Sequence, residues 1–242
     1  MITDPIPRAA AKRAEFDRSD ALLTMPLPPA EILRAHTDGL VAAMEKGEGR
    51  PVTYACAELL GALADFYAVP PPPVAVLGVR PHKLTSGVCT YQLFGDYTPA
   101  TQRIRVWMRT AIRGKVSSPK ALLNTLLHEF CHHLDCTRLR CPESFHTRGF
   151  FWRIDHLYHH ALGTPPDRRR PLRWIRRGGV WAIDWAKLRG ALTLPDPSQI
   201  PSQPARTAFA WALALGSGVR TSLRSGVSAR VRVASRSSSR RK

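Results

Sequence analysis

The sequence predicts a fold of the α+β class, because helical and strand patterns occupy separate stretches of the chain. Apolar residues recur at helical spacing before a run of four prolines at 70–73. Strand patterns follow the prolines, and two more helical patterns follow the strands. Such segregation of helices and strands is typical of an α+β domain.

Two helices are expected before the prolines. The first begins at about Pro28, and the second covers residues 52–69. The second helix has one apolar stripe, which we expect to be buried. The stripe consists of Leu59, Leu60, Leu63 and Phe66.

Three strands are expected next: an apolar strand at 74–79, then two strands around a turn at 95–101. The last strand, 102–109, alternates in character, so its two faces should differ. Its inward residues are predicted to be Ile104, Val106 and Met108. Its exposed residues are predicted to be Arg103, Arg105, Trp107 and Arg109.

A helix with clear start signals comes after the strands. Ser118 can cap it, and Pro119 suits its first position. The loop "CTRLRCPESF" separates it from a last helix at 146–163, which Gly163 should end.

The first of these two helices carries its polar residues on one face, within "LLNTLLHEFCHHLD" at 122–135. At about 100° per residue, His132 lies about 40° from His128, and Asp135 about 20° to the other side. The leucines lie on the far side. His133 falls near the leucines, so we exclude it as a partner of His128.

His128, Glu129 and His132 form the pattern H-E-x-x-H. On a helix, this spacing presents two imidazoles to one Zn²⁺ ion and places a carboxylate beside the metal-bound water. A catalytic zinc needs a third protein ligand, for which His146 is the first candidate. The rival candidates for this ligand are Glu143, Asp155 and His156.

Other interpretations of these residues stay open. The polar face is also compatible with a simple polar patch on a helix. The thiols Cys131, Cys136 and Cys141, together with the histidines, are compatible with a structural metal site. His156 and His160 are also spaced i, i+4, but we expect them on a solvated face. Asp135 either orients a ligand histidine or is exposed to water.

Two segments, "LLHEFCHHLD" and "ESFHTRGFFWRIDHL", resemble the SprT-like zinc metallopeptidase domain over roughly residues 85–160. The resemblance implies a zincin-like domain, in which a small β-sheet packs on the metal-binding helix and flanking helices. It also implies His128, His132 and His146 as zinc ligands and Glu129 as the catalytic carboxylate. This chain departs from many family members by placing Thr147 and Arg148 before Gly149. It also has no cysteine after Cys141, so the zinc ribbon of members that act on DNA-bound proteins is absent.

The chain is expected to have three parts. Residues 1–27 form a mobile N-terminal segment, residues 28–163 form the metallopeptidase domain, and residues 164–242 form a basic, Pro/Arg/Ser-rich extension that is largely disordered. Within the extension, residues 180–192 are expected to form a short amphipathic helix, and the stretch from Pro201 contains nine basic residues and no acid.

The predicted function is hydrolysis of peptide bonds by a zinc-activated water, with Glu129 as general base. The strand 102–109 is predicted to be the cleft edge that pairs with an extended substrate. Tyr158 is a guess for a stabiliser of the transition state.

The net charge of +18 suggests contact with nucleic acid through the basic tail, and the alternative is a tail that only keeps the protein soluble. Contact with nucleic acid would add nucleic-acid-associated proteins to the expected substrates. The alternative is a non-enzymatic nucleic-acid-binding protein whose metal is structural. An odd count of five cysteines and the lack of a signal peptide or a membrane-length apolar run predict a cytoplasmic protein.

Overall fold

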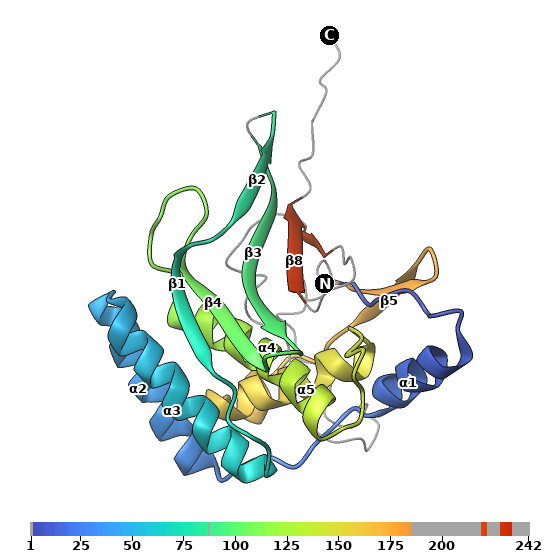
Figure 1. Ribbon diagram of the computed structural model, residues 1–242, viewed down its shortest axis with the longest axis horizontal. Coiled ribbons are helices and arrows are strands. Elements are labelled where there is room, and N and C mark those ends of the chain that lie inside the picture. Colours follow the sequence, from blue (N-terminus) through green and yellow to red (C-terminus); the bar gives the residue numbers. More distant parts are fainter. Residues whose placement is uncertain (1, 87, 185–218, 222–227, 234–242) are drawn as a thin grey trace.

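The computed structural model describes residues 2–86, 88–184, 219–221 and 228–233, which form a mixed α and β structure (Figure 1). This confirms the α+β class. The helices in this part of the chain are α1 (Ala10–Ala21), α2 (Ala30–Lys46), α3 (Gly49–Tyr67), α4 (Pro119–Thr137) and α5 (Arg148–Ala161), with a short 3-10 turn at Pro166–Arg168.

The main sheet has the order β1-β4-β3-β8-β7, and β2 pairs with β3 off this path. Its strands are β1 (Val74–Val79), β2 (His82–Thr85), β3 (Val88–Thr98), β4 (Arg103–Arg109), β7 (Val219–Thr221) and β8 (Ser228–Val233). Only β1 and β4 are parallel; the other pairs are antiparallel. A separate hairpin consists of β5 (Trp174–Arg177) and β6 (Val180–Ile183).

β4 has partners on both sides, β1 and β3. The prediction that residues 102–109 are a cleft edge is therefore wrong, because the backbone groups of β4 are already used within the sheet. The turn before β4 is also shorter than predicted, since β3 continues through Gly95 to Thr98.

The two faces of β4 differ less than predicted. Ile104, Val106 and Met108 are buried as expected, but Trp107 is buried as well. The Trp107 ring lies 5.6 Å from the guanidinium carbon of Arg105, so the arginine covers an aromatic group that we expected to be exposed.

The main core lies between the sheet and helices α2, α3, α4 and α5. In α3, the predicted stripe is buried at Leu59, Leu60 and Leu63, but Phe66 is 39% exposed. Tyr67 takes the buried position instead, and its hydroxyl donates to the Pro26 carbonyl over 2.7 Å. α2 and α3 lie side by side at one end of the molecule, and α1 lies at the other (Figure 1).

The start signals predicted for α4 are confirmed. The Ser118 hydroxyl accepts from the Ala121 backbone N–H over 3.3 Å, with Pro119 in the first turn of α4. Thr147 caps α5 in the same way, accepting from the Phe150 N–H over 3.0 Å.

The N-terminal segment, which we expected to be a mobile lead-in, contains α1. Phe16 and Ser19 of this helix are buried, and Ile2 forms an isolated β-bridge with Ala182 of β6. Sequence periodicity missed this arrangement because α1 is mostly polar and is held by contacts with residues far along the chain.

The C-terminal extension also differs from its prediction where it is described. Val180–Ile183 is a strand rather than the start of a helix, because it pairs with β5. Residues 185–192 of that predicted helix lie outside the described residues. β7 and β8 fall within the stretch predicted to be disordered, and β8 pairs with β3 from Gln92 to Asp96. None of the described helices is long and apolar enough to cross a membrane.

Gly149, at the start of α5, is a point of close approach to the end of α1. A Cβ atom there would lie 2.8 Å from the carbonyl oxygens of Asp20 and Leu22, and nearer still to that of Ser19. Backbone carbonyls cannot move aside without displacing α1. The absence of a side chain at Gly149 therefore permits this packing.

We predict that Gly149→Ala lowers the free energy of unfolding by about 1–3 kcal/mol, as overpacking does in other cores. Urea unfolding measures this change. Gly39→Ala in α2 is the matched control, because no atom lies within 4 Å of the added methyl group. The control should be neutral or stabilising, since alanine favours a helix by about 1 kcal/mol over glycine. Equal stabilities of the two variants would contradict the close approach of α1.

Candidate metal centre

Three histidines meet between α4 and the loop that precedes α5. His128 and His132 project from one face of α4, one turn apart, and His146 reaches them from the loop. The Nε2 atom of His128 lies 3.1 Å from Nε2 of His146 and 3.2 Å from Nε2 of His132. The structure therefore brings together the three histidines that the sequence predicted, and within the described residues they form a cluster able to hold a metal ion.

Ser144 fixes the ring of His132. The Ser144 hydroxyl lies 2.7 Å from His132 Nδ1 and 2.9 Å from Asp135 Oδ2. A hydroxyl has one hydrogen, and an ionised carboxylate only accepts, so Ser144 donates to Asp135 and accepts from His132 Nδ1–H. This tautomer leaves the Nε2 lone pair of His132 directed at the other two imidazoles.

His146 is held by Asp4 of the N-terminal segment. The Asp4 carboxylate accepts from the His146 backbone N–H over 2.9 Å, and its Oδ2 atom lies 3.5 Å from His146 Nδ1. The Asp4 backbone N–H also donates to the His146 carbonyl over 2.9 Å. Asp4 thus places the ring of His146 and lies on its Nδ1 side.

Glu129 is fully buried on the neighbouring side of α4. Neither of its carboxylate oxygens has a hydrogen-bond partner among the described residues. The side chain packs against Gly95 of β3, where an added Cβ would lie 2.9 Å from Oε1. Burial, with a smaller contribution from the charge of Asp96, raises the pKa of Glu129 well above its ordinary value. A buried carboxylate without a partner is costly, which points to a functional role.

The imidazoles of His128 and His132 are held in their neutral form. Burial is the main cause that lowers the pKa of both rings, and neighbouring imidazoles lower it further. A neutral imidazole is the form that binds a metal ion. Phe150 adds an apolar wall, because its ring centroid lies 4.5 Å from that of His132 and 5.2 Å from that of His128.

The rival third ligands are engaged elsewhere. Glu143 forms an ion pair with Lys12 at 2.8 Å, and its side chain is 40% exposed. Asp155 is buried 3.7 Å from His159 Nε2. His156 lines a pocket between α1 and α5. None of the three belongs to the histidine cluster.

The other residues considered for the site lie outside the histidine cluster. His133 lies outside the cluster as predicted, because its ring contacts the Tyr97 hydroxyl and the Pro70 carbonyl. The three nearby cysteines are free thiols and are not in the cluster either. The prediction that His160 is solvated is wrong: it is half-buried, with its Nε2 2.7 Å from the Pro28 carbonyl. Tyr158 belongs to the main core, which gives its guessed catalytic role no support.

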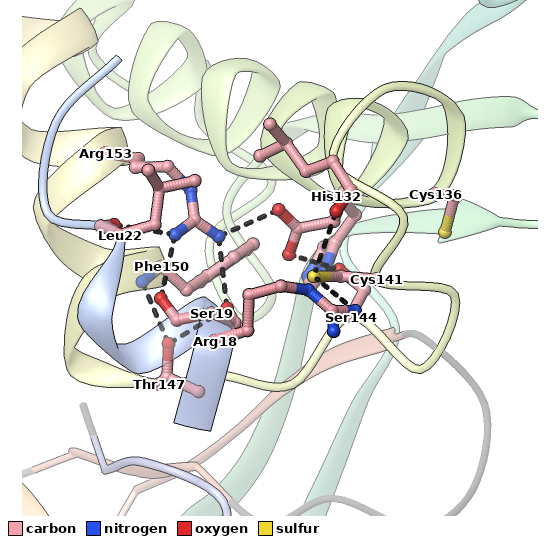
Figure 2. Close-up of polar contacts among 12 residues, drawn as sticks. Arg18, Ser19, Leu22, His132, Cys136, Cys141, Ser144, Thr147, Phe150 and Arg153 are labelled. Atoms are coloured by element: carbon pink, nitrogen blue, oxygen red, sulfur yellow. Dashed lines mark hydrogen bonds and ion pairs between the residues drawn. The ribbon is translucent and has the colours of Figure 1, made fainter. Parts of the chain in front are cut away.

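Asp135 is fully buried, not exposed to water, and it pairs with Arg153 at 2.8 Å. Burial raises the pKa of Asp135 to about 6, although Arg153 and the Ser144 hydroxyl act to lower it. Arg153 also donates to the carbonyls of Ser19 and Leu22, so α1 is joined to α4 and α5 (Figure 2). Sequence reasoning missed Ser144, Arg153 and Asp4, because no local pattern marks a contact made across the fold.

We predict that Ser144→Ala weakens zinc binding by about 10–100-fold, the usual cost of losing a group that orients a ligand histidine. Competition with a chelating dye measures the affinity. Ser117→Ala is the matched control: this serine is also buried, but its hydroxyl donates to the Met108 carbonyl. Equal zinc affinities for both variants and the wild type would show that Ser144 does not position His132.

No family model matches the chain, and no curated protein or solved structure is significantly similar to it.

Proposed function

We propose that the protein is a zinc-dependent metallopeptidase, in which His128, His132 and His146 hold the ion and Glu129 is the general base. One observation carries the proposal: three imidazole nitrogens converge, and Glu129, the residue after the first of these histidines, is a buried carboxylate that has no hydrogen-bond partner among the described residues. The same residues support the proposal that the chain is a SprT-like peptidase.

The donor set fits zinc. Three neutral imidazoles are a common ligand set of catalytic zinc sites, which keep one position open. The Nδ1 contacts of His132 with Ser144 and of His146 with Asp4 leave both Nε2 atoms available for the ion. Bound here, Zn²⁺ would polarise a peptide carbonyl and lower the pKa of a water molecule to about 7.

Glu129 is the residue that moves the proton in this proposal. Its carboxylate takes a proton from water as the water oxygen forms a bond to the peptide carbonyl carbon. It then gives this proton to the amide nitrogen as the carbon–nitrogen bond breaks, which releases a carboxylic acid and an amine. Within the described part of the chain no hydrogen bond competes for Glu129, which leaves both oxygens available for this exchange.

The competing proposal is a structural metal in a non-enzymatic nucleic-acid-binding protein. Structural zinc sites are almost always closed by four protein ligands. Among the described residues the cluster offers three, and the neighbouring cysteines stand outside it. The donor count therefore favours the catalytic proposal.

We predict that Glu129→Gln retains zinc but cleaves unfolded casein at least about 100-fold more slowly, since general acid–base catalysis contributes about 10²–10⁴-fold. Release of amino groups measures cleavage, and atomic absorption measures zinc. Glu58→Gln, on the exposed side of α3, is the control and should cleave at the wild-type rate. Wild-type turnover in Glu129→Gln would remove Glu129 from the mechanism.

We predict that His146→Ala raises the dissociation constant for zinc by more than about 100-fold, because losing a ligand should cost more than losing a group that orients one. His82→Ala, in the exposed strand β2, is the matched control and should keep full zinc occupancy. Full occupancy in His146→Ala would assign the third ligand to another residue.

A further inference from the structure

The hairpin β5–β6 and the segment leading into it are exceptionally rich in arginine. Six arginines fall between positions 168 and 177, and the whole stretch 164–184 contains no lysine. The six are Arg168, Arg169, Arg170, Arg173, Arg176 and Arg177. Guanidinium groups bind phosphate oxygens in a fixed, bidentate geometry that an ammonium group lacks.

The tip of the hairpin is narrow and basic. Arg176 pairs with Trp181 and Arg177 with Val180, so Gly178 and Gly179 form a two-residue turn. Both glycines have positive φ angles, 54° and 84°, which this kind of tight turn requires. Successive strand residues point to opposite faces, so Arg176 and Arg177 project from the two sides of the ribbon.

Three of these arginines have no ion-pair partner among the described residues. Arg173, Arg176 and Arg177 are exposed, and no ion pair among the described residues involves them. Such a cluster raises the local concentration of anions and favours a polyanionic partner.

The base of the hairpin is fixed beside the metal centre. Leu172 and Ile183 are buried in a cluster with Phe150 and Phe151, and the Trp174 ring lies 5.9 Å from the Phe151 ring. Phe151 in turn lies 5.7 Å from the His146 ring. The hairpin is therefore an ordered arm, placed on the side of the molecule opposite to α2 and α3 (Figure 1).

We propose that this hairpin binds the groove of double-stranded DNA. The major groove is about 12 Å wide and admits a two-stranded β-ribbon. Its sugar–phosphate backbones lie on both sides of an inserted ribbon, which suits arginines that project from both faces. An anionic membrane would instead favour apolar residues at the tip, where this chain has two glycines. The inference assigns nucleic-acid binding to an ordered arm rather than to the basic tail alone, and it does not depend on peptidase activity.

The test is the salt dependence of binding to a fluorescent 20-base-pair duplex, measured by anisotropy with the full-length, zinc-loaded protein. Each phosphate contact contributes about 0.9 to the slope of log affinity against log salt concentration. Arg176→Gln/Arg177→Gln should therefore reduce the magnitude of the slope by about 2 and weaken binding. Both side chains are exposed, so the zinc content and the free energy of unfolding should stay at their wild-type values.

Arg50→Gln/Arg113→Gln is the matched control, with the same loss of charge at exposed positions outside the hairpin. It should leave the slope unchanged. An equal reduction by both double variants would mean that binding follows net charge, which overturns the proposal. A smaller slope seen only for Arg240→Gln/Arg241→Gln would show that the tail, and not the hairpin, binds the duplex. This result would also overturn the proposal. An effect of the hairpin variant on single-stranded DNA or on anionic vesicles, but not on the duplex, would exclude the groove as the binding site.

Discussion

The candidate metal centre depends on one buried ion pair, between Arg153 of α5 and Asp135 of α4. The two side chains are 1% and 0% exposed, and their charged atoms lie 2.8 Å apart. Burying a charge costs several kcal/mol unless its hydrogen-bonding groups are satisfied. Arg153 meets this demand by also donating to the carbonyls of Ser19 and Leu22. Carbonyls at the end of a helix such as α1 lack partners within the helix. The Arg153 guanidinium therefore provides hydrogen-bond donors for carbonyl groups at the end of α1, and it connects α1 to α4 and α5.

The loop that carries His146 is held from the same direction. Its backbone is bound by side chains of α1: Glu15 accepts from the Glu143 N–H over 2.8 Å, and Arg18 donates to the Arg140 carbonyl over 2.6 Å. Asp4 then holds His146 itself. A loop on its own would leave the imidazole mobile, and a ligand must be held to within about 0.5 Å to be effective. The N-terminal segment is therefore part of the candidate metal centre.

The sequence predicted those parts of the centre that a helix determines by itself. The separation of His128 and His132 follows from helical geometry, and the start of α4 follows from Ser118 and Pro119. His146 could be predicted as the third ligand because few residue types bind zinc, although its position depends on the fold of the loop. Ser144, Asp4 and Arg153 could not be found, because they act through contacts between segments distant in sequence. The wrong prediction for β4 has the same origin: a strand's pattern gives its two faces but not its neighbours in the sheet.

The carboxylates of Asp4, Glu129 and Asp135 would affect the charge balance around a bound cation. A divalent ion held by three neutral imidazoles keeps its two positive charges, which are costly in a buried site unless anions lie nearby. Asp135 is already balanced by Arg153, so it adds orientation without net charge. Asp4 and Glu129 are the carboxylates that can offset the ion, one beside His146 and one next to His128 in sequence. A bound cation would favour the ionised form of Glu129, which burial alone disfavours. In the proposed mechanism the ion and Glu129 would therefore be coupled, because loading the site would also prepare Glu129 to accept a proton.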